Sequence, residues 1–451
     1  MNQHTPSITL IGAGLVGSLT ALLLAQRGFR VSVYERRPDM RKADISAGRS
    51  INLALANRGI FPLQQAGIMD QVEPLLTAMK GRMIHDKQGN CHLQPYGQKS
   101  EEVIFSVSRA DLNILCLNEA EKTGLVEFHF EHKCVAVDID KREMQIEHHE
   151  KNSTIGFNQI VGTDGSASAV REAIHAKTSD YHRIEPLGHS YKELTIPSAP
   201  NGQFQMEPNA LHIWPRGGYM VIALPNRDGS FTVTLFMPNE GEVSFASINN
   251  AESLMAFFER EFPDTLALIP DLTTSFFANP TGHLATVRAK PWHYQDSALL
   301  LGDAAHAIVP FHGQGMNCGF EDALEFVQQI DRNPNNWSEI FQGTELNRFA
   351  NGNAIADMAI ENYIEMRDSV NDPIFVLKKQ LSFELEKRFP ERFIPRYSMV
   401  MFHRLPYSEA QQRGKIQSDI LEQLIAGKKD LHSIDYALAA QLIEQKLPVF
   451  N

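Results

Sequence analysis

The sequence predicts an α/β protein with three parts: a doubly wound parallel-sheet domain, an inserted antiparallel β-sheet domain and a C-terminal α-helical region. Three observations predict this fold. A short apolar strand at 7–11 runs into a glycine-rich turn and a helix. Short β-rich runs separated by Gly, Pro and Asn fill much of 191–286, and apolar residues recur at helical spacing after 323. With 451 residues, the chain is long enough for several domains.

The first domain is expected to be discontinuous, comprising 1–75, 100–180 and 287–335. The sheet domain comprises 76–99 and 181–286, with 82–96 predicted as a hairpin that turns at 88–90. The helical region comprises 336–451 and is expected to cover a pocket as a lid. Its apolar residues form two stripes predicted to face a core, one within 416–425 and one at Leu438, Leu442, Ile443 and Leu447.

Composition excludes several classes of function. The formal net charge of −12 argues against a surface for polyanions, so no nucleic-acid partner is expected. The four cysteines show no C-x-x-C spacing, which indicates a reduced, cytoplasmic environment. The seventeen histidines form no recognisable ligand motif, so no metal site is expected. The apolar stretch 8–25 carries spaced glycines and follows no basic segment, so neither a signal peptide nor a membrane anchor is expected.

The N-terminal strand, turn and helix have the pattern of a Rossmann-like dinucleotide site. Gly12, Gly14 and Gly17 have G-x-G-x-x-G spacing, and the following strand, 30–35, ends in Glu35. Glycines let backbone amides approach a pyrophosphate, whose charge the helix N-terminus stabilises. Glu35 stands where the ribose-binding carboxylate belongs. Val16 and Arg36, which are neighbours of these residues, are also expected to contact the cofactor.

Two further turns fit a single cofactor site with this one. Gly302-Asp303 follows the apolar strand that begins at Leu299, and Asp164-Gly165 ends the strand-turn 160–165. Each has a plain alternative, since Asp303 can cap a helix and Asp164 can belong to an ordinary turn. Their occurrence in this order with the glycine-rich turn favours the cofactor interpretation.

These motifs together resemble the class A flavoprotein monooxygenases. The resemblance implies a GR2-like FAD-binding domain in which Asp303, after Gly302, contacts the ribityl chain and Asp164 belongs to a second fingerprint. It also implies that Arg109 lies near the flavin. Gly315, Met316 and Asn317 then begin a helix whose amides could face the N1–O2 edge of the flavin. Since only one dinucleotide fingerprint is present, NADPH is expected to bind transiently, with O2 as the other co-substrate.

Other strings resemble the branch of this family that hydroxylates L-kynurenine to 3-hydroxy-L-kynurenine in tryptophan degradation. These strings are 48–55, 82–85, 95–97, 206–209, 211–216, 222–226, 234–238 and 362–367. The resemblance implies an oxygen transfer through a flavin C4a-hydroperoxide, and the protein contributes placement of the substrate and a dry pocket. No side-chain nucleophile or base is required, because the substrate's amine already activates its ring.

The same resemblance implies a set of substrate contacts. Arg82 is expected to pair with the substrate carboxylate, as suits a planar guanidinium, with help from Tyr96, Tyr397 and Asn362. Met366 shares a helical face with Asn362. The residues expected to enclose the aromatic ring are Leu211, Ile222, Leu224, Phe236, Pro310, Phe311 and His312. The first four would be ordinary sheet core in most proteins, and His312 is expected to act as wall rather than as a proton relay.

Two alternative functions stay open at this point. One is a class A hydroxylase acting on a different aromatic acid, and the other is a flavin-binding protein without turnover. A flavin halogenase is disfavoured, because no W-x-W-x-I-P-like string occurs around Trp214. The oligomeric state is expected to be a monomer or a homodimer.

Overall fold

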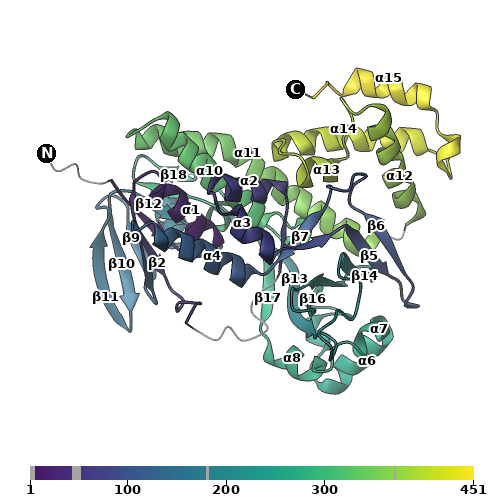
Figure 1. Ribbon diagram of the computed structural model, residues 1–451, viewed down its shortest axis with the longest axis horizontal. Coiled ribbons are helices and arrows are strands. Elements are labelled where there is room, and N and C mark those ends of the chain that lie inside the picture. The colour runs from purple at the N-terminus through teal and green to yellow at the C-terminus, as the bar shows by residue number, and fades with distance from the viewer. Residues whose placement is uncertain (1–5, 43–51, 179–181, 370–371, 451) are drawn as a thin grey trace.

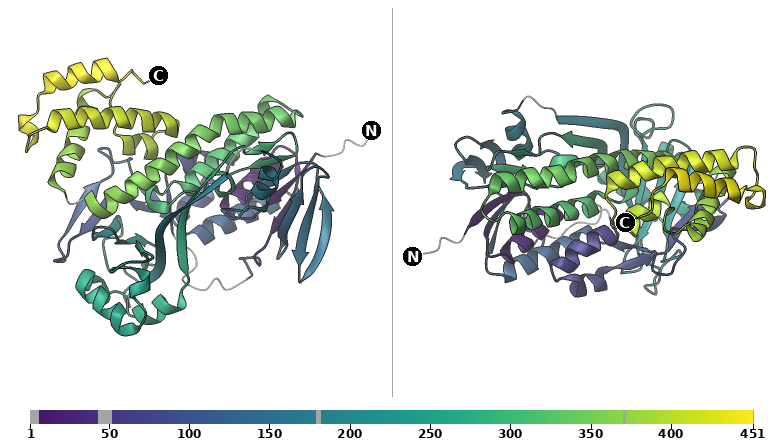
Figure 2. Two further views of the ribbon diagram at one scale, coloured as in Figure 1. Left: turned by 180° about the vertical axis from the view of Figure 1, so that it is seen from behind. Right: turned by 90° about the horizontal axis from the view of Figure 1, so that it is seen from above.

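The structure is a computed structural model that describes residues 6–42, 52–178, 182–369 and 372–450. Helices and strands form three neighbouring regions, with the N-terminal sheet near one end and the last helices, α12 to α15, at the other (Figures 1 and 2). Part of the string 48–55, at 48–51, lies outside the described residues.

A six-stranded sheet forms the centre of the first region, in the order β18-β19-β12-β1-β2-β8. All pairs are parallel except β18 with β19. Its strands are β1 (Ser7–Ile11), β2 (Arg30–Glu35), β8 (Val126–Phe130), β12 (Ile160–Gly162), β18 (His293–Tyr294) and β19 (Ala298–Leu300). The predicted strands 7–11 and 30–35 are therefore confirmed. Because β12, β1 and β19 are parallel neighbours, their carboxyl ends bring three distant turns to one sheet edge.

Helices cover this sheet through two apolar clusters. The larger cluster packs α1, α4 and α10 on the strands, and α1 is buried along almost its whole length because every turn carries Leu or Ala. The smaller cluster packs α5 and a β-meander. The helices of this region are α1 (Leu15–Ala25), α2 (Asn57–Gln65), α3 (Met69–Val72), η1 (Glu73–Leu75), α4 (Arg109–Lys122), α5 (Ala169–His175), α9 (Asp303–His306), η3 (Pro310–His312) and α10 (Gly315–Arg332).

Two three-stranded sheets flank the six-stranded sheet, in the orders β11-β10-β9 and β3-β7-β4. Their strands are β3 (Leu53–Leu55), β4 (Thr77–Met79), β7 (Ile104–Val107), β9 (Lys133–Asp138), β10 (Glu143–His148) and β11 (Lys151–Gly156). The alternating residues at 135–146 lie in the antiparallel hairpin of β9 and β10. β7 lies between β3 and β4 and pairs antiparallel with both, so 53–55 and 77–79 lie on opposite sides of it.

A seven-stranded sheet follows the order β17-β13-β16-β15-β14-β5-β6. Its strands are β5 (Gly81–His85), β6 (Cys91–Pro95), β13 (His182–Ile196), β14 (Leu211–Pro215), β15 (Met220–Pro225), β16 (Phe231–Pro238) and β17 (Thr281–Ala289). The hairpin at 82–96 is confirmed. The expectation of a wholly antiparallel sheet needs one correction, because β14 and β5 pair in parallel, with Leu211 opposite Arg82. The division of the chain into domains stays a prediction.

Short helices cover one face of this sheet through an aromatic-rich cluster that includes Phe257, Phe258 and Phe262. They are η2 (Phe245–Ser247), α6 (Ala251–Glu261), α7 (Pro263–Leu266) and α8 (Leu272–Ala278), at the lower edge of Figure 1. The other face contributes Ile213, Met220 and Phe236 to a cluster shared with η3 and the long helix α11. This second face therefore packs against η3, the segment that follows the Gly302-Asp303 turn.

The C-terminal region is helical, as predicted. It contains α11 (Trp337–Ile364), the π-helical turn η4 (Glu365–Ser369), α12 (Pro373–Arg388), α13 (Arg396–Met401), α14 (Tyr407–Ile425), η5 (Leu431–Ser433) and α15 (Tyr436–Lys446). Ile420, Leu424 and Ile443 meet in one core cluster. Leu438 does not, since 39 % of its surface is exposed, so its assignment to a core stripe was wrong. In the described ranges, no helix combines the length and apolar character that a membrane crossing needs.

Candidate active site

The glycine-rich turn between β1 and α1 leaves open space beside Gly14. Gly12 adopts φ +102°, and a Cβ there would meet the carbonyl oxygen of Thr163, so only glycine fits. A Cβ on Gly17 would meet the carbonyl oxygen of Gly12, so this position allows α1 to pack against the turn. At Gly14 an added Cβ would meet nothing within 4 Å. A tight turn, an open backbone and close helix packing are what a pyrophosphate cradle requires.

Glu35 lies at the end of β2 and contacts this turn. Its Oε2 accepts a hydrogen bond from the backbone N–H of Ala13 at 2.9 Å, and its Oε1 accepts one from Arg37 Nε at 2.8 Å. Burial opposes ionisation of Glu35, but hydrogen bonds and the charge of Arg37 outweigh it and lower the pKa. Glu35 is thus an ionised acceptor at the turn, while Arg36 is exposed. Its contact with a ribose stays a prediction.

Two carboxyl groups follow the neighbouring strands at the same sheet edge. Asp164 follows β12, and its Oδ2 accepts a hydrogen bond from the N–H of Ala169 at 2.8 Å. Its Oδ1 is buried without a hydrogen-bond partner among the described residues, so it is available to a hydroxyl donor. Asp303 follows β19 and lines the main cavity, where burial raises its pKa. Arg109, at the start of α4, lines the same cavity.

The N-terminus of α10 also faces the cavity, through Gly315 and Met316. The helix begins at Gly315 and runs for 18 residues, so its first amides present partial positive charge there. Asn317 is different, because its side chain is buried and bonded to the backbone. Its Oδ1 accepts from Ala56 N–H at 2.9 Å and its Nδ2 donates to Ala54 O at 2.8 Å. Asn317 therefore fixes β3 and α2 against α10.

The main cavity has a volume of about 290 Å³ and joins the FAD-type motifs to the seven-stranded sheet. The predicted site residues that line it are Gly14, Val16, Arg82, Tyr96, Arg109, Leu211, Ile222, Leu224, Phe236, Asp303, Pro310, Phe311, His312, Gly315, Met316, Met366 and Tyr397. Outside its lining are Gly12, Gly17, Glu35, Arg36, Asp164, Gly302, Asn317 and Asn362.

The sheet supplies the apolar wall of the cavity. Leu211, Ile222 and Phe236 come from three adjacent strands, and the ring of Phe236 meets that of Phe311 edge-on, with 4.9 Å between centroids. Phe311 in turn stacks on Tyr363 of α11 at 3.8 Å. Aromatic pairs of this kind hold flat, rigid surfaces, which suit an aromatic ligand.

Arg82 and three polar residues lie together at one end of the cavity. The guanidinium donates from Nη1 to Glu365 Oε1 at 2.9 Å and from Nη2 to Asn362 Oδ1 at 3.2 Å. Its Nε is buried without a partner among the described residues. Tyr96 and Tyr397 stack at 5.4 Å beside it. Burial raises the pKa of Tyr96 to about 12, so its hydroxyl keeps its proton at neutral pH. These four residues form what we call the Arg82 clamp: Arg82, Tyr96, Asn362 and Tyr397.

His312 lies in the cavity wall and stacks on Tyr397 with 5.5 Å between centroids. Burial and nearby arginines lower the pKa of His312 to about 3, so its ring is neutral at physiological pH. Its Nδ1 is buried without a partner in the described parts of the chain. A neutral ring held by stacking fits a wall, as the sequence led us to expect.

Two residues near the site were missed by sequence reasoning. Glu365, the ion-pair partner of Arg82, follows Asn362 by three residues and so shares its helical face, a spacing that could have identified it. Asn52 lines the cavity, and its Nδ2 donates to Pro225 O at 3.2 Å, which ties the segment before β3 to the seven-stranded sheet. No local signal predicts that contact.

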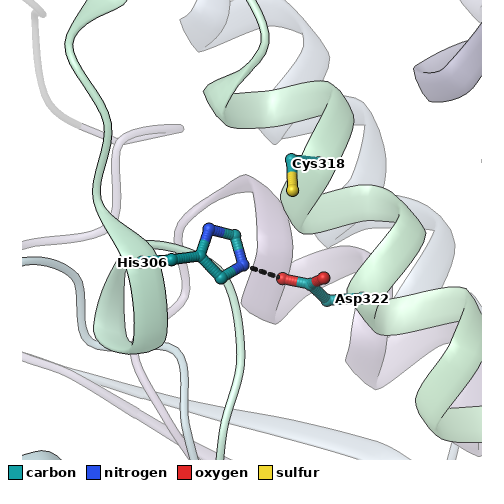
Figure 3. A group of neighbouring side chains, drawn as sticks. All are labelled: His306, Cys318 and Asp322. Atoms are coloured by element: carbon teal, nitrogen blue, oxygen red, sulfur yellow. Dashed lines mark hydrogen bonds and ion pairs between the residues drawn. The ribbon is translucent and has the colours of Figure 1, made fainter. Parts of the chain in front are cut away.

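A buried group of potential metal ligands lies behind the Gly302 turn (Figure 3). His306 Nε2 and Asp322 Oδ2 are 2.5 Å apart, and the same Oδ2 accepts from Gly302 N–H at 3.1 Å. Arg348 donates from Nε to Asp322 Oδ1 at 2.7 Å and from Nη2 to the Sγ of Cys318 at 3.3 Å. Because a guanidinium already supplies the compensating charge, this group is an ion-pair network that fixes the turn carrying Asp303.

Comparison with known proteins adds the family. A model of the FAD binding domain family matches residues 5–333. A kynurenine 3-monooxygenase of Stenotrophomonas maltophilia is 47 % identical over 447 residues, covering 99 % of this chain and 98 % of that protein. One of Myxococcus xanthus is 46 % identical over 448 residues, covering 98 % and 96 %. The chain belongs to the kynurenine 3-monooxygenase family.

Solved structures of two oxygenases share the fold of this kynurenine 3-monooxygenase family member. The tetrameric form of 2-methyl-3-hydroxypyridine-5-carboxylic acid oxygenase superposes with a TM-score of 0.65 at 17 % identity, covering 85 % of this chain and 98 % of that chain. A probable FAD-dependent monooxygenase of Pseudomonas aeruginosa, PqsL, gives 0.63 at 21 % identity, covering 80 % and 97 %. At these identities the likeness concerns the fold alone.

Proposed function

We propose that this protein is an FAD-dependent monooxygenase that converts L-kynurenine to 3-hydroxy-L-kynurenine with NADPH and O2. The observation that carries the proposal is the main cavity. Its lining combines residues of the FAD-type turns, an apolar wall from the sheet, and Arg82, Tyr96 and Tyr397 of the Arg82 clamp. This arrangement offers a cation and hydroxyl donors for a carboxylate at a distance from the cofactor, with an aromatic slot between them.

The residues present fit FAD. The turn at Gly12–Gly17 would hold the pyrophosphate, Glu35 the adenosine ribose, and Asp164 and Asp303 the remaining hydroxyls, with the free Oδ1 of Asp164 as one acceptor. The first amides of α10 would face the pyrimidine edge of the flavin. When bound, FAD supplies the hydride acceptor for NADPH and the means of activating O2 for transfer of one oxygen atom to the ring.

The chain's own contribution is placement of the substrate. We assign the substrate carboxylate to Arg82, whose guanidinium can accept a further ligand without losing Glu365 or Asn362, because its Nε is free. Tyr96 and Tyr397 would donate hydroxyls to the same group. Held at its carboxylate end, the substrate would present its aniline ring between the sheet and Phe311.

Exclusion of water is the second contribution. The substrate half of the cavity is walled by Leu211, Ile222, Leu224, Phe236 and Phe311, which hold no ionisable group. His312 stays neutral there and so brings no charge to the ring. A dry pocket limits loss of the activated oxygen to water.

The test is NADPH consumption by the FAD-loaded protein with and without L-kynurenine, with products separated by chromatography. Kynurenine-dependent oxidation with 3-hydroxykynurenine as product is expected. Stimulation that yields only hydrogen peroxide would favour a hydroxylase of another aromatic acid. No stimulation by any aromatic acid would favour a flavin-binding protein without turnover. Because its four cysteines are free thiols, we further propose that the enzyme acts in the cytoplasm. We also propose that it is a monomer or a homodimer.

A further inference from the structure

A second cavity of about 240 Å³ lies under the C-terminal helices, next to the main cavity. Arg82, Tyr96, His312 and Tyr397 line both cavities, so these residues form a partition between them. The remaining lining comes from α11, η4, α12, α13, α14 and the segment 393–395. The four residues of the Arg82 clamp line this cavity as well, but Lys379, Ser398 and the phenylalanines of its lining have no part in the proposed reaction.

The second cavity carries an uncompensated positive charge. Arg82, Lys378 and Arg396 line it, but each is paired with a glutamate. Lys379 lines it too and forms no ion pair with any described residue. Burial, together with the charge of Arg82, lowers the pKa of Lys379 to about 8, and Glu365 offsets this shift only in part. A partly buried cation of this kind is stabilised by an incoming anion.

Four polar atoms in the lining lack hydrogen-bond partners among the described residues, namely the hydroxyls of Ser398 and Tyr96, Nε of Arg82 and Nδ1 of His312. Of these four residues only Ser398, which is 1 % exposed, does not also line the main cavity. Buried polar groups are nearly always hydrogen-bonded, so free ones in a cavity wall point to a ligand. The Ser398 hydroxyl and the Lys379 ammonium are both donors, and a carboxylate accepts from both.

Aromatic side chains form much of the rest of the lining. Phe375, Phe383 and Phe393 line the cavity together with the stacked pair of Tyr96 and Tyr397. The main cavity's 290 Å³ include its flavin end, so the 240 Å³ of the second cavity are enough for a ligand of the substrate's size. The chemistry of the walls is also repeated, since each cavity pairs aromatic surfaces with donors for an anion.

We propose that the second cavity is a binding site for an aromatic carboxylate, held by Lys379 and Ser398, and that a second molecule of the substrate's class occupies it while the first cavity is filled. The naming of L-kynurenine as that molecule rests on the proposed function. The carboxylate would lie on the C-terminal side of the partition and the ring among the phenylalanines.

The test titrates the FAD-loaded protein with L-kynurenine by two methods. Flavin absorbance reports occupation of the main cavity, whereas calorimetry reports all binding. We expect one molecule per flavin from absorbance and two from calorimetry. Lys379→Met should weaken the second event at least about tenfold and keep the one-site flavin response. Lys387→Met is the matched control, since it removes an exposed lysine, paired with Glu384, from the same helix and should keep both events.

Three outcomes decide between the explanations. One molecule per flavin by both methods would overturn the proposal, as would a second event that survives both Lys379→Met and Lys379→Gln. Thermal melting and FAD content of each variant exclude a folding defect as the cause of a loss. If the flavin spectrum never responds to L-kynurenine, the proposed function fails. In that case a heat of binding that depends on Lys379 still supports the second site. If no such heat is measured, the second site is overturned as well.

Discussion

Glu365 accepts a hydrogen bond from Arg82 at 2.9 Å, so the cation assigned to the substrate carboxylate already has an anionic partner. Glu365 begins the π-helical turn η4, and π-helical turns often occur at functional sites. Since a guanidinium has five N–H donors, Arg82 can keep Glu365 and Asn362 while its free Nε and the two tyrosines receive a ligand. Glu365 thereby orients the donor fork.

Arg82→Ala should raise the KM for L-kynurenine at least about 100-fold, because removing one partner of a buried, hydrogen-bonded charge pair costs about 2–5 kcal/mol. Bound FAD should be retained, since Arg82 lies at the end of the cavity away from the FAD-type turns. Steady-state kinetics and the flavin-to-protein absorbance ratio measure both effects. Arg332→Ala, which removes an exposed arginine, is the control. Purification of Arg82→Ala without flavin would contradict the assignment.

Asp303→Ala should weaken FAD binding by about 10- to 100-fold, because a hydrogen bond to a charged group contributes about 1.5–3 kcal/mol. Burial raises the pKa of Asp303, so its ionised form depends on donors that a cofactor would bring. Fluorescence titration of the apoprotein with FAD measures the loss. Asp296→Ala, which breaks an exposed ion pair of 2.7 Å with Arg142, should bind FAD normally. Equal FAD affinity in the two variants would count against a contact from Asp303.

Asp322→Asn should lower the free energy of unfolding by up to about 3 kcal/mol at neutral pH, because it removes one of the two carboxylates paired with buried Arg348 and leaves only Glu321 among the described residues. Burial alone would raise the pKa of Asp322, but His306 and Arg348 outweigh it and lower the pKa to about 2. The folded pKa is thus below the unfolded value of about 3.9. The contribution is complete above about pH 4 and is lost as pH falls towards 2.

Urea denaturation of both proteins between pH 3 and pH 7 checks this prediction. The difference in the free energy of unfolding should shrink as the pH falls, because the wild type then loses the ionised Asp322 carboxylate that the variant lacks at every pH. A constant difference across that range would show that Asp322 is not the ionised partner in the network.

The local parts of the fold could be predicted because short segments carry their own signals. The glycines at 12–17 require a tight turn, and Gln88-Gly89-Asn90 ends one strand and starts the next. The parallel pairing of β5 with β14 could not be predicted, because it joins strands about 130 residues apart through long-range packing. It is this pairing that sets Arg82 opposite Leu211 and so builds the substrate end of the cavity.

The sequence pointed to site residues where it contains strings that resemble the family. It gave no signal for features that depend on packing alone. Arg82, Tyr96 and Tyr397 lie together as the resemblance implied. The second cavity forms because α12, α13 and α14 pack over the residues that separate the two cavities. No sequence motif in 373–425 predicts it. The exposure of Leu438 has a similar origin, since helical spacing alone cannot tell which end of a stripe reaches the core.

His312→Asn should leave the shape of the pH profile of kcat/KM between pH 5 and 8 as it is in wild type. Because burial lowers the pKa of His312 to about 3, its ring does not change charge in that interval. The height of the profile should fall, since a smaller side chain alters the wall beside Tyr397. Loss of an ionisation from the profile would instead assign a proton-transfer role to this histidine.

The second binding event should weaken as pH rises through about 8. The pKa of Lys379 is lowered to about 8 mainly by burial and also by the charge of Arg82, with Glu365 opposing the shift. Lys378 and Arg396 are the other charged groups in the lining, and both are paired with glutamates. Because a folded pKa below the usual lysine value means a neutral amine at high pH, affinity for a carboxylate is full at neutral pH and declines above about 8.

Calorimetry with L-kynurenine from pH 6.5 to 9.5 measures this decline, and subtraction of the Lys379→Met titration removes any effect of the ligand's own amine. The first event should stay comparatively constant, because Arg82 does not lose its proton in this range. A second event whose affinity is independent of pH would mean that another group holds the carboxylate, and a parallel decline of both events would point to the ligand rather than to Lys379.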